Sequence, residues 1–198
     1  MTLPELRRPE RERRPPTPVR ILHAAAERVV ADGAANLSMQ GVADLAGVSK
    51  GLIHYHFHDK ETLLTRLIEW MTRESTAREQ AALARSTPTT AVDDLWTWVT
   101  GELARGHIRV LIDLSQERGP LIAEAVRNAA HTRRVAAAAT VSRLFSLLEL
   151  QPRVPIPLLA DVVVAFVDGM AIHAALSPES NHRVAFDVFW LSLLSLAE

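Results

Sequence analysis

Residues 38–60 hold the side chains best suited to chemistry in this chain, and that chemistry is phosphate binding. Tyr55 is the only tyrosine, and its hydroxyl can donate to a phosphate oxygen, as can the ammonium group of Lys60. Ser38 and Ser49 stand where short helices would begin, and the free backbone N–H groups of a helix start also favour anions. The stretch therefore favours contact with a nucleic-acid backbone.

The same stretch contains His54, His56 and His58, which together with Asp59 suggest a zinc site. The predicted helix ends near Phe57, however, and His56 would point away from the other two rings. Nothing nearby would orient the rings as a metal site requires. We expect no metal site, and the histidines are interpreted as surface groups that face DNA.

Elsewhere, His107, Asp113, Ser115 and His173 could in principle form an acid–base set. The sequence has no nucleophile elbow, no glycine-rich phosphate loop and no spaced pair of carboxylates. Isolated polar residues on helices are usually satisfied core or rim groups. We therefore expect no catalytic residues and no cofactor, and an enzyme remains only as the alternative from a different class.

The elements that would position the phosphate-binding groups form a helix-turn-helix. Ser38 is a good N-cap for a first short helix, and Gly47 lies where a tight turn needs positive φ. Ser49 would cap a second helix, in which Ile53 and Phe57 turn inward. Two short helices joined by a turn with glycine are typical of this motif, whose second helix enters the DNA major groove.

The sequence from Gly47 to Phe57, followed by Asp59 to Leu64, resembles the DNA-binding signature of TetR-family transcriptional regulators. The resemblance covers about a quarter of the chain, from Val19 to about Leu64. Met39 stands where the family often has a threonine, and His54 where it often has a tyrosine. The resemblance implies DNA contacts from Ser38, Met39, Ser49, Lys50, Gly51, His54, Tyr55, His56 and Lys60.

Proline, glycine and polar breaks divide the rest of the chain into helices, and no strand pattern is present. Together with the resemblance, this pattern predicts an all-α fold in which a long helix joins a three-helix head to a helical body. Helices are expected at 17–33, 60–85, 91–105, 108–116, 121–150, 158–176 and 184–197. The predicted domains are a flexible Arg/Pro-rich arm (1–16), the helix-turn-helix domain (17–62) and a ligand-binding and dimerisation domain (63–198).

The arm at residues 1–16 has five arginines among four prolines, interrupted by three glutamates. It could reach phosphates or an adjacent minor groove. The interleaved acidic residues favour a solvated tail instead.

The last two predicted helices are apolar almost all round. Such helices must be buried on every side, either in an internal core or against a second copy of the chain. We expect a homodimer through residues 158–197, as the TetR resemblance also implies. A two-fold interface would hold two reading helices about one DNA turn apart.

The resemblance further implies a ligand cavity between the long helix and the helices that follow it. The candidate lining residues are mostly large and apolar, which is usual for a small-molecule site, and they predict an apolar effector. They are Trp70, Met71, Glu74, Trp96, Val99, Leu103, His107, Leu111, Phe145, Phe166 and Met170.

Composition sets broader limits. The 198 residues contain no cysteine, which excludes disulfides and thiolate chemistry and fits a cytoplasmic protein. No run of about 18 apolar residues predicts a membrane span, and the Arg/Pro-rich start is unlike a secretory signal. Residues 1–60 have a formal charge of +2 and the remainder −3, as for a small basic reader on an acidic body.

Together these patterns predict a homodimeric repressor that binds a palindromic double-stranded DNA operator and leaves it when a small-molecule effector binds. A constitutive DNA-binding protein without an effector is the alternative that the sequence leaves open.

Overall fold

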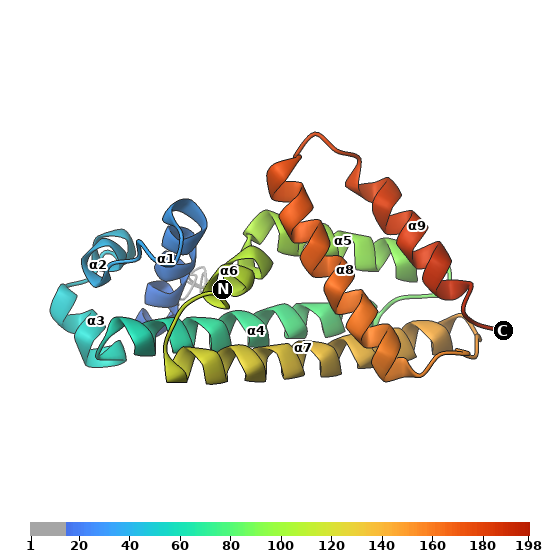
Figure 1. Cartoon of the computed structure of the whole chain (residues 1–198), viewed down its shortest axis with the longest axis horizontal. Coiled ribbons are helices and arrows are strands. Elements are labelled where there is room, and N and C mark those ends of the chain that lie inside the picture. The colour runs from blue at the N-terminus through green and yellow to red at the C-terminus, as the bar shows by residue number, and fades with distance from the viewer. Residues whose placement is uncertain (1–14) are drawn as a thin grey trace, which may run out of the picture.

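The computed structural model describes residues 15–198, and these residues fold into nine α-helices (Figure 1). The all-α architecture predicted from the sequence is confirmed. The predicted arm falls largely on residues 1–14, which lie outside the described part of the chain. The helices are α1 (Thr17–Asp32), α2 (Met39–Ala46), α3 (Lys50–Phe57), α4 (Lys60–Ala84), α5 (Ala91–Arg105), α6 (His107–Leu114), α7 (Pro120–Leu147), α8 (Ile156–Leu176) and α9 (His182–Leu194).

Helices α1–α3, here called the head, lie at one end of the long helix α4 (Figure 1). The Ser38 hydroxyl accepts the N–H of Gly41 at 3.0 Å, and the Ser49 hydroxyl accepts that of Leu52 at 3.2 Å. Gly47 ends α2 in the left-handed conformation, with φ of 62°. The local signals read from the sequence therefore set both helix boundaries of the turn.

Helices α4–α9 form what we call the body. Helix α4 begins at the cap of Asp59, whose carboxylate accepts the N–H of Thr62 at 2.7 Å, and it packs along α7. Glu61, in the first turn of α4, accepts the N–H of Leu121 at 3.1 Å and so fixes the start of α7 beside the start of α4. The two long helices form the frame on which the other body helices lie (Figure 1).

Two cores hold the molecule together. One contains the buried side chains of the head together with residues of α4, α6 and the first half of α7, including Leu67, Leu114 and Ile122. The other fills the body between α5, α7, α8 and α9 around Phe145 and Phe186. Because α6 contributes Leu114 to the first core and Ile108 to the second, it links the head to the body.

The boundaries of three late elements differ from those expected. Helix α6 ends at Leu114 and α7 at Leu147, earlier than the residues expected from the sequence. Helix α9 ends at Leu194, since the chain then pairs in extended form with the loop before α8. There the N–H groups of Gln151 and Glu198 each donate to the carbonyl of the other, at 2.9 and 3.0 Å.

Helix α8 is the one helix among the described residues that is long and apolar enough to cross a membrane. This is a finding of length and composition alone, which the core helix of a soluble protein also satisfies. Its apolar residues divide between two faces. Leu159, Val163 and Val167 are buried in the body core, whereas Leu158 and Val162 are more than half exposed.

Candidate nucleic-acid interface and effector cavity

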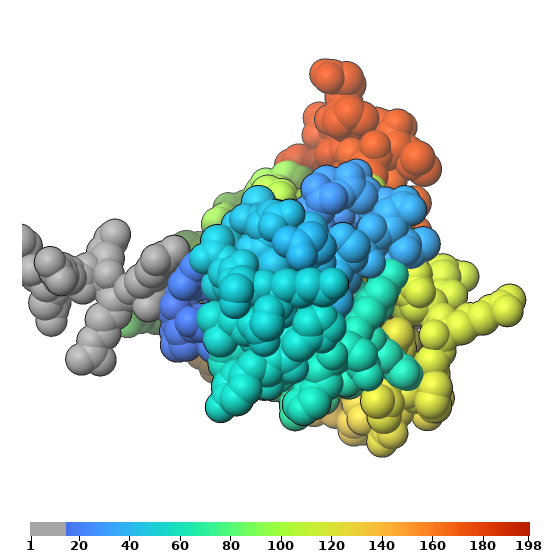
Figure 2. Space-filling model, turned by 90° about the vertical axis from the view of Figure 1, so that its left-hand side faces the viewer, coloured from blue at the N-terminus to red at the C-terminus, as the bar shows by residue number. Residues whose placement is uncertain are grey.

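Helix α3 presents a polar face at the end of the molecule. Its apolar side chains Ile53 and Phe57 are buried in the head, so Lys50, His54 and Tyr55 face outward. The Tyr55 side chain is 77% exposed, which is unusual for a residue with so much apolar surface. Figure 2 shows the surface formed by this end of the molecule, where α2 and α3 lie side by side. The exposed face is convex and can enter a groove.

The two capped helix starts lie beside this face. Ser38 and Ser49 are exposed, and each caps its helix with the side-chain oxygen. Met39 is half-buried against the head core, so its side chain is turned away from a ligand in this structure. Its backbone N–H, in the first turn of α2, remains suited to a phosphate oxygen. Gly51 is exposed in the first turn of α3.

Two predicted DNA contacts already have partners within the chain. The Lys60 ammonium donates to the carbonyl of Ala35 at 3.0 Å, and His54 Nδ1 donates to the carbonyl of His58 at 2.7 Å. The second bond holds the imidazole at the end of α3, where His58 has a positive φ of 58°. His54 therefore keeps Nε2 for an outside partner. His56 is half-buried with its ring against Tyr55.

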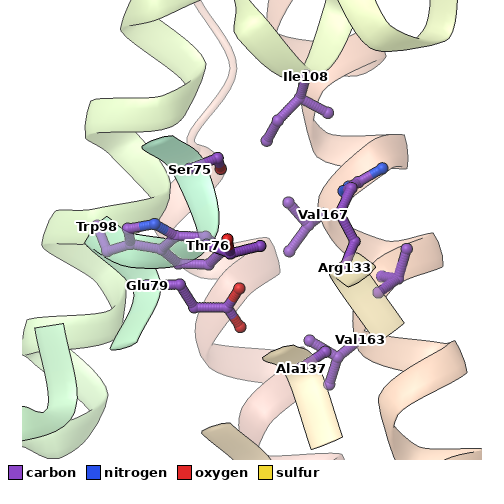
Figure 3. Close-up of a pocket in the computed structure, with 10 residues that line it drawn as sticks. Ser75, Thr76, Glu79, Trp98, Ile108, Arg133, Ala137, Val163 and Val167 are labelled. Carbon is purple, nitrogen blue, oxygen red and sulfur yellow. The ribbon is translucent and has the colours of Figure 1, made fainter. Parts of the chain in front are cut away.

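The second candidate site is a small cavity inside the body, lined from α4, α5, α6, α7 and α8 (Figure 3). Its volume is about 20 Å³, which is room for one water molecule. Val163 and Val167 of α8 and Ile108 of α6 form its apolar wall, while Glu79, Trp98 and Arg133 bring polar atoms to it. The cavity therefore combines an apolar surface with a few polar groups.

Glu79 is the most unusual group in the cavity. It is 6% exposed and accepts a hydrogen bond from the Thr140 hydroxyl at 2.9 Å. Burial raises the pKa of Glu79 to about 7, although the Thr140 hydrogen bond and the charge of Arg133 act in the opposite direction. Arg133 itself forms a salt bridge with Asp168. Glu79 is thus a buried acid near its ionisation midpoint at neutral pH.

None of the eleven residues predicted to line an effector pocket lines this cavity. Trp70, Glu74 and His107 line a separate cleft of about 360 Å³ between α1 and the body, and Leu111 lines another cavity of about 170 Å³. The others belong to the body cores or pack against them: Met71, Val99, Phe145 and Met170 are buried, and Trp96, Leu103 and Phe166 are partly buried.

The cleft between α1 and the body is lined by aromatic rings. Trp70 lies edge-on between His23 and His107, with ring centroids 4.6 and 5.5 Å apart. Burial lowers the pKa of His107, and its Nδ1 is buried without a hydrogen-bond partner among the described residues. The cleft is open to solvent and lies between α1 of the head and the body.

Glu79, Trp98, Arg133 and Thr140 are not among the residues that the sequence indicates. A signal for Glu79 exists: it falls on the buried stripe of α4, four residues after Ser75 and four before Leu83, both of which are buried. A carboxylate on such a stripe indicates a polar interior. Trp98, Arg133 and Thr140 cannot be identified from the sequence, because they reach the cavity only when α5 and α7 pack onto α4.

The residues considered for acid–base chemistry have separate partners. Asp113 accepts the N–H of Ala34, and the Ser115 hydroxyl donates to the carbonyl of Ile112. His107 packs on Trp70, and His173 packs on His182. Within residues 15–198, no group of three or more His, Cys, Asp or Glu side chains could hold a metal ion.

Comparison with known proteins places the two sites in context. Residues 21–67 match the model of the family described as bacterial regulatory proteins, tetR family. No curated protein sequence matches the chain. The matched segment contains the capped helices and every exposed group on the α3 face.

Solved structures share the fold over nearly the whole chain. A transcriptional regulator from Rhodococcus sp. Rha1 has 21% identity and a TM-score of 0.73, covering 92% of this chain and 98% of its own. A TetR transcriptional regulator from Legionella pneumophila has 19% identity and a TM-score of 0.68, covering 89% and 96%. SmeT, in complex with triclosan, has 17% identity and a TM-score of 0.66, covering 89% and 90%.

Proposed function

Since residues 21–67 match the tetR family of bacterial regulatory proteins, we propose that the protein is a homodimeric DNA-binding repressor released by a small-molecule effector. In this proposal residues 17–62 read DNA, and residues 63–198 bind the effector and form the dimer. The protein acts on double-stranded DNA in the cytoplasm. The observation that carries the proposal is the exposed face of α3, with Tyr55 at its centre.

In the proposed complex α3 lies in the major groove. Lys50 and the free Nε2 of His54 reach base edges, whereas Tyr55 and the backbone N–H groups at the starts of α2 and α3 bind phosphates. Lys60 reaches a phosphate by exchanging its bond to the Ala35 carbonyl for one to DNA. Phosphate contacts set the register, and base contacts select the sequence.

Exposed apolar side chains on α8 and α9 support the dimer. On α8 they recur at spacings of four, ten and four residues, and on α9 at four and three, so they lie on one side of each helix. The stacked rings of Phe166 and Phe189, 3.8 Å apart, hold the two helices together. Water would cover this surface in a single chain, and a second copy would bury it. The exposed residues are Leu158, Val162, Ile172, Leu176, Val184, Val188 and Leu191.

The path from effector to DNA runs through α6. Ile108 lines the body cavity near the start of α6, and Asp113 near its end accepts the N–H of Ala34 from the turn that follows α1 at 2.8 Å. An effector larger than the cavity must displace part of its wall. Movement of α6 would then move the head. The effector shifts the equilibrium only because it prefers the displaced state.

The complex of SmeT with triclosan supports a small-molecule effector, since that protein has the same fold. We propose that the effector's apolar part lies against Val163 and Val167 in this chain. Constitutive DNA binding, without an effector, remains the second candidate. It is favoured by the small volume of the cavity in this structure.

Selection of bound fragments from sheared genomic DNA tests the proposed function. The expected product is an inverted repeat with half-sites whose centres lie about 10 base pairs, or one helical turn, apart. A parallel selection with Tyr55→Ala should enrich the same repeat less strongly, because that variant loses a phosphate contact. Enrichment of unrelated fragments by both proteins would contradict the proposal.

A further inference from the structure

We propose that the body cavity binds the cationic group of its effector, with the Glu79 carboxylate as counter-ion and the Trp98 indole as a second contact. This inference rests on the proposed function, because it names the chemical class of the effector. It differs from the apolar effector that the sequence predicts, and it follows from charges that only the folded chain brings together.

Glu79 is a buried acid that has no salt bridge among the described residues. Its partner is the neutral Thr140 hydroxyl. The neighbouring cation, Arg133 of α7, is already paired with Asp168 of α8. A buried carboxylate without a countercharge is costly, so a cation that enters the cavity gains an interaction that the chain itself does not provide.

The other charged group that acts on Glu79 is also paired. Glu102 of α5 is fully buried and accepts two hydrogen bonds from Arg78, at 2.6 and 3.1 Å, with Arg105 nearby at 3.6 Å. Helix α6 contributes the apolar Ile108 to the cavity. Glu79 is therefore the group in the cavity wall whose charge is left for a ligand.

Trp98 supplies a second contact beside Glu79. Figure 3 shows its indole next to Thr76 and Glu79. The indole Nε1 is buried and has no hydrogen-bond partner among the residues that the structure describes. Indole faces attract organic cations, most strongly when water is excluded. A carboxylate and an indole on one side, with valines opposite and with Arg133 of the wall already paired with Asp168, fit a compact cation that carries an apolar group.

Proton linkage separates this class of ligand from the others. A cation favours ionised Glu79, so its binding releases a proton and strengthens as the pH rises towards 7 and above. An anion has the opposite effect, and a neutral apolar ligand favours the protonated acid. Because Glu79 titrates near pH 7, the sign of the pH dependence distinguishes a cation from the other two classes in an accessible range.

The test uses two probes of nearly the same shape, benzyltrimethylammonium, which is permanently charged, and neutral neopentylbenzene. Their binding to the full-length protein is measured by calorimetry between pH 5.5 and 8. We expect the ammonium probe to bind more tightly than neopentylbenzene at pH 8. Its affinity should fall by up to about tenfold for each pH unit below 7.

Glu79→Gln should lower the affinity for the ammonium probe at least tenfold at pH 8 and abolish the pH dependence of its binding. Glu124→Gln, which removes the same charge from an exposed site on α7, should change neither. Equal affinity for both probes, no binding of the ammonium probe, or unchanged binding in Glu79→Gln would overturn the inference.

Operator binding by the same protein samples, measured without probe, tests the proposed function separately. If the protein binds DNA selectively but does not bind the ammonium probe, only the proposed chemical class of the effector is contradicted. Loss of selective DNA binding contradicts the proposed function, whatever the probes show.

Discussion

The Asp113 carboxylate accepts the backbone N–H of Ala34 at 2.8 Å, across 79 residues of sequence. This bond joins α6 of the body to the turn between α1 and α2 of the head. The Gly33 backbone lies at the same place, with positive φ, and a side chain there would meet the Asp113 carboxylate at 3.8 Å. A shift of α6 along its axis therefore acts directly on the head.

Asp113→Ala should weaken the link between effector and DNA. The variant loses one hydrogen bond to a charged acceptor, which should lower the free energy of unfolding by about 1–3 kcal/mol. Operator affinity without effector should change little, while the effector-induced loss of affinity should shrink severalfold. Asp113→Asn keeps an acceptor oxygen for the Ala34 N–H and serves as the matched control. Equal effector responses in Asp113→Ala and the unmodified chain would contradict the role given to this bond.

Tyr55→Phe removes only the phenolic hydroxyl from a side chain that is 77% exposed. Its melting temperature should stay unchanged, since the side chain lies on the surface and the change leaves no cavity in the core. Operator affinity should fall about tenfold, as expected for one hydrogen bond to a charged phosphate. Fluorescence anisotropy measures the affinity, and circular dichroism checks the fold. Unaltered affinity would remove Tyr55 from the proposed contacts.

Glu79→Gln should stabilise the protein at alkaline pH. The pKa of Glu79 is raised from 4.5 to about 7 by burial, so between these values the folded chain binds more protons than the unfolded chain. The free energy of unfolding therefore falls as the pH rises from about 4.5 to 7, and the loss persists above 7.

The glutamine has no proton to lose and can still accept the Thr140 hydrogen bond. At pH 8 its free energy of unfolding should exceed that of the unmodified chain by about 1–3 kcal/mol, with little gain at pH 4.5. Urea unfolding at both pH values measures the difference, with Glu124→Gln as control. A gain that is the same at both pH values would show that Glu79 ionisation is not its cause.

Leu191→Asp places a charge on the exposed apolar face of α9, where the leucine is 69% exposed. A single chain should tolerate the change, whereas a dimer that buries this face should dissociate. Sedimentation is expected to give a monomer, and operator affinity should fall at least a hundredfold because one head then binds alone. Val135→Asp, at a 57% exposed site on α7, controls for an added surface charge. A Leu191→Asp protein that remains dimeric would place the interface elsewhere.

Short-range signals explain why the head could be predicted from the sequence. Ser38, Ser49 and Asp59 each cap a helix through a hydrogen bond to a residue three positions later, so sequence alone contains the interaction. Gly47 and Gly106 end helices with positive φ for an equally local reason. Helix α1 is an exception: it begins at Thr17, and Pro16 precedes it without a side-chain hydrogen bond.

The cavity could not be predicted because it depends on where helices cross. The sequence predicts large apolar residues such as Phe145 and Met71 as pocket walls, but in the structure these side chains fill the core. The wall contains smaller residues, such as Ser75 and Ala137, together with a buried acid. Periodicity identifies which face is buried, but it does not distinguish a filled interior from a hollow one. For the same reason, periodicity identifies α8 and α9 as apolar but does not divide their residues into core and exposed parts.

The central claim is that the exposed face of α3 reads a specific DNA sequence. The most direct measurement is fluorescence anisotropy of the full-length protein on a selected genomic site and on a scrambled duplex of the same composition, over a series of salt concentrations. We predict tight binding to the selected site, with a logarithm of the binding constant that falls linearly with the logarithm of the salt concentration. Binding to the scrambled duplex should be at least a thousandfold weaker. Lys50→Ala should reduce that preference, whereas Tyr55→Ala should weaken binding to both duplexes. Equal affinity for the two duplexes, unaffected by either substitution, would contradict the claim.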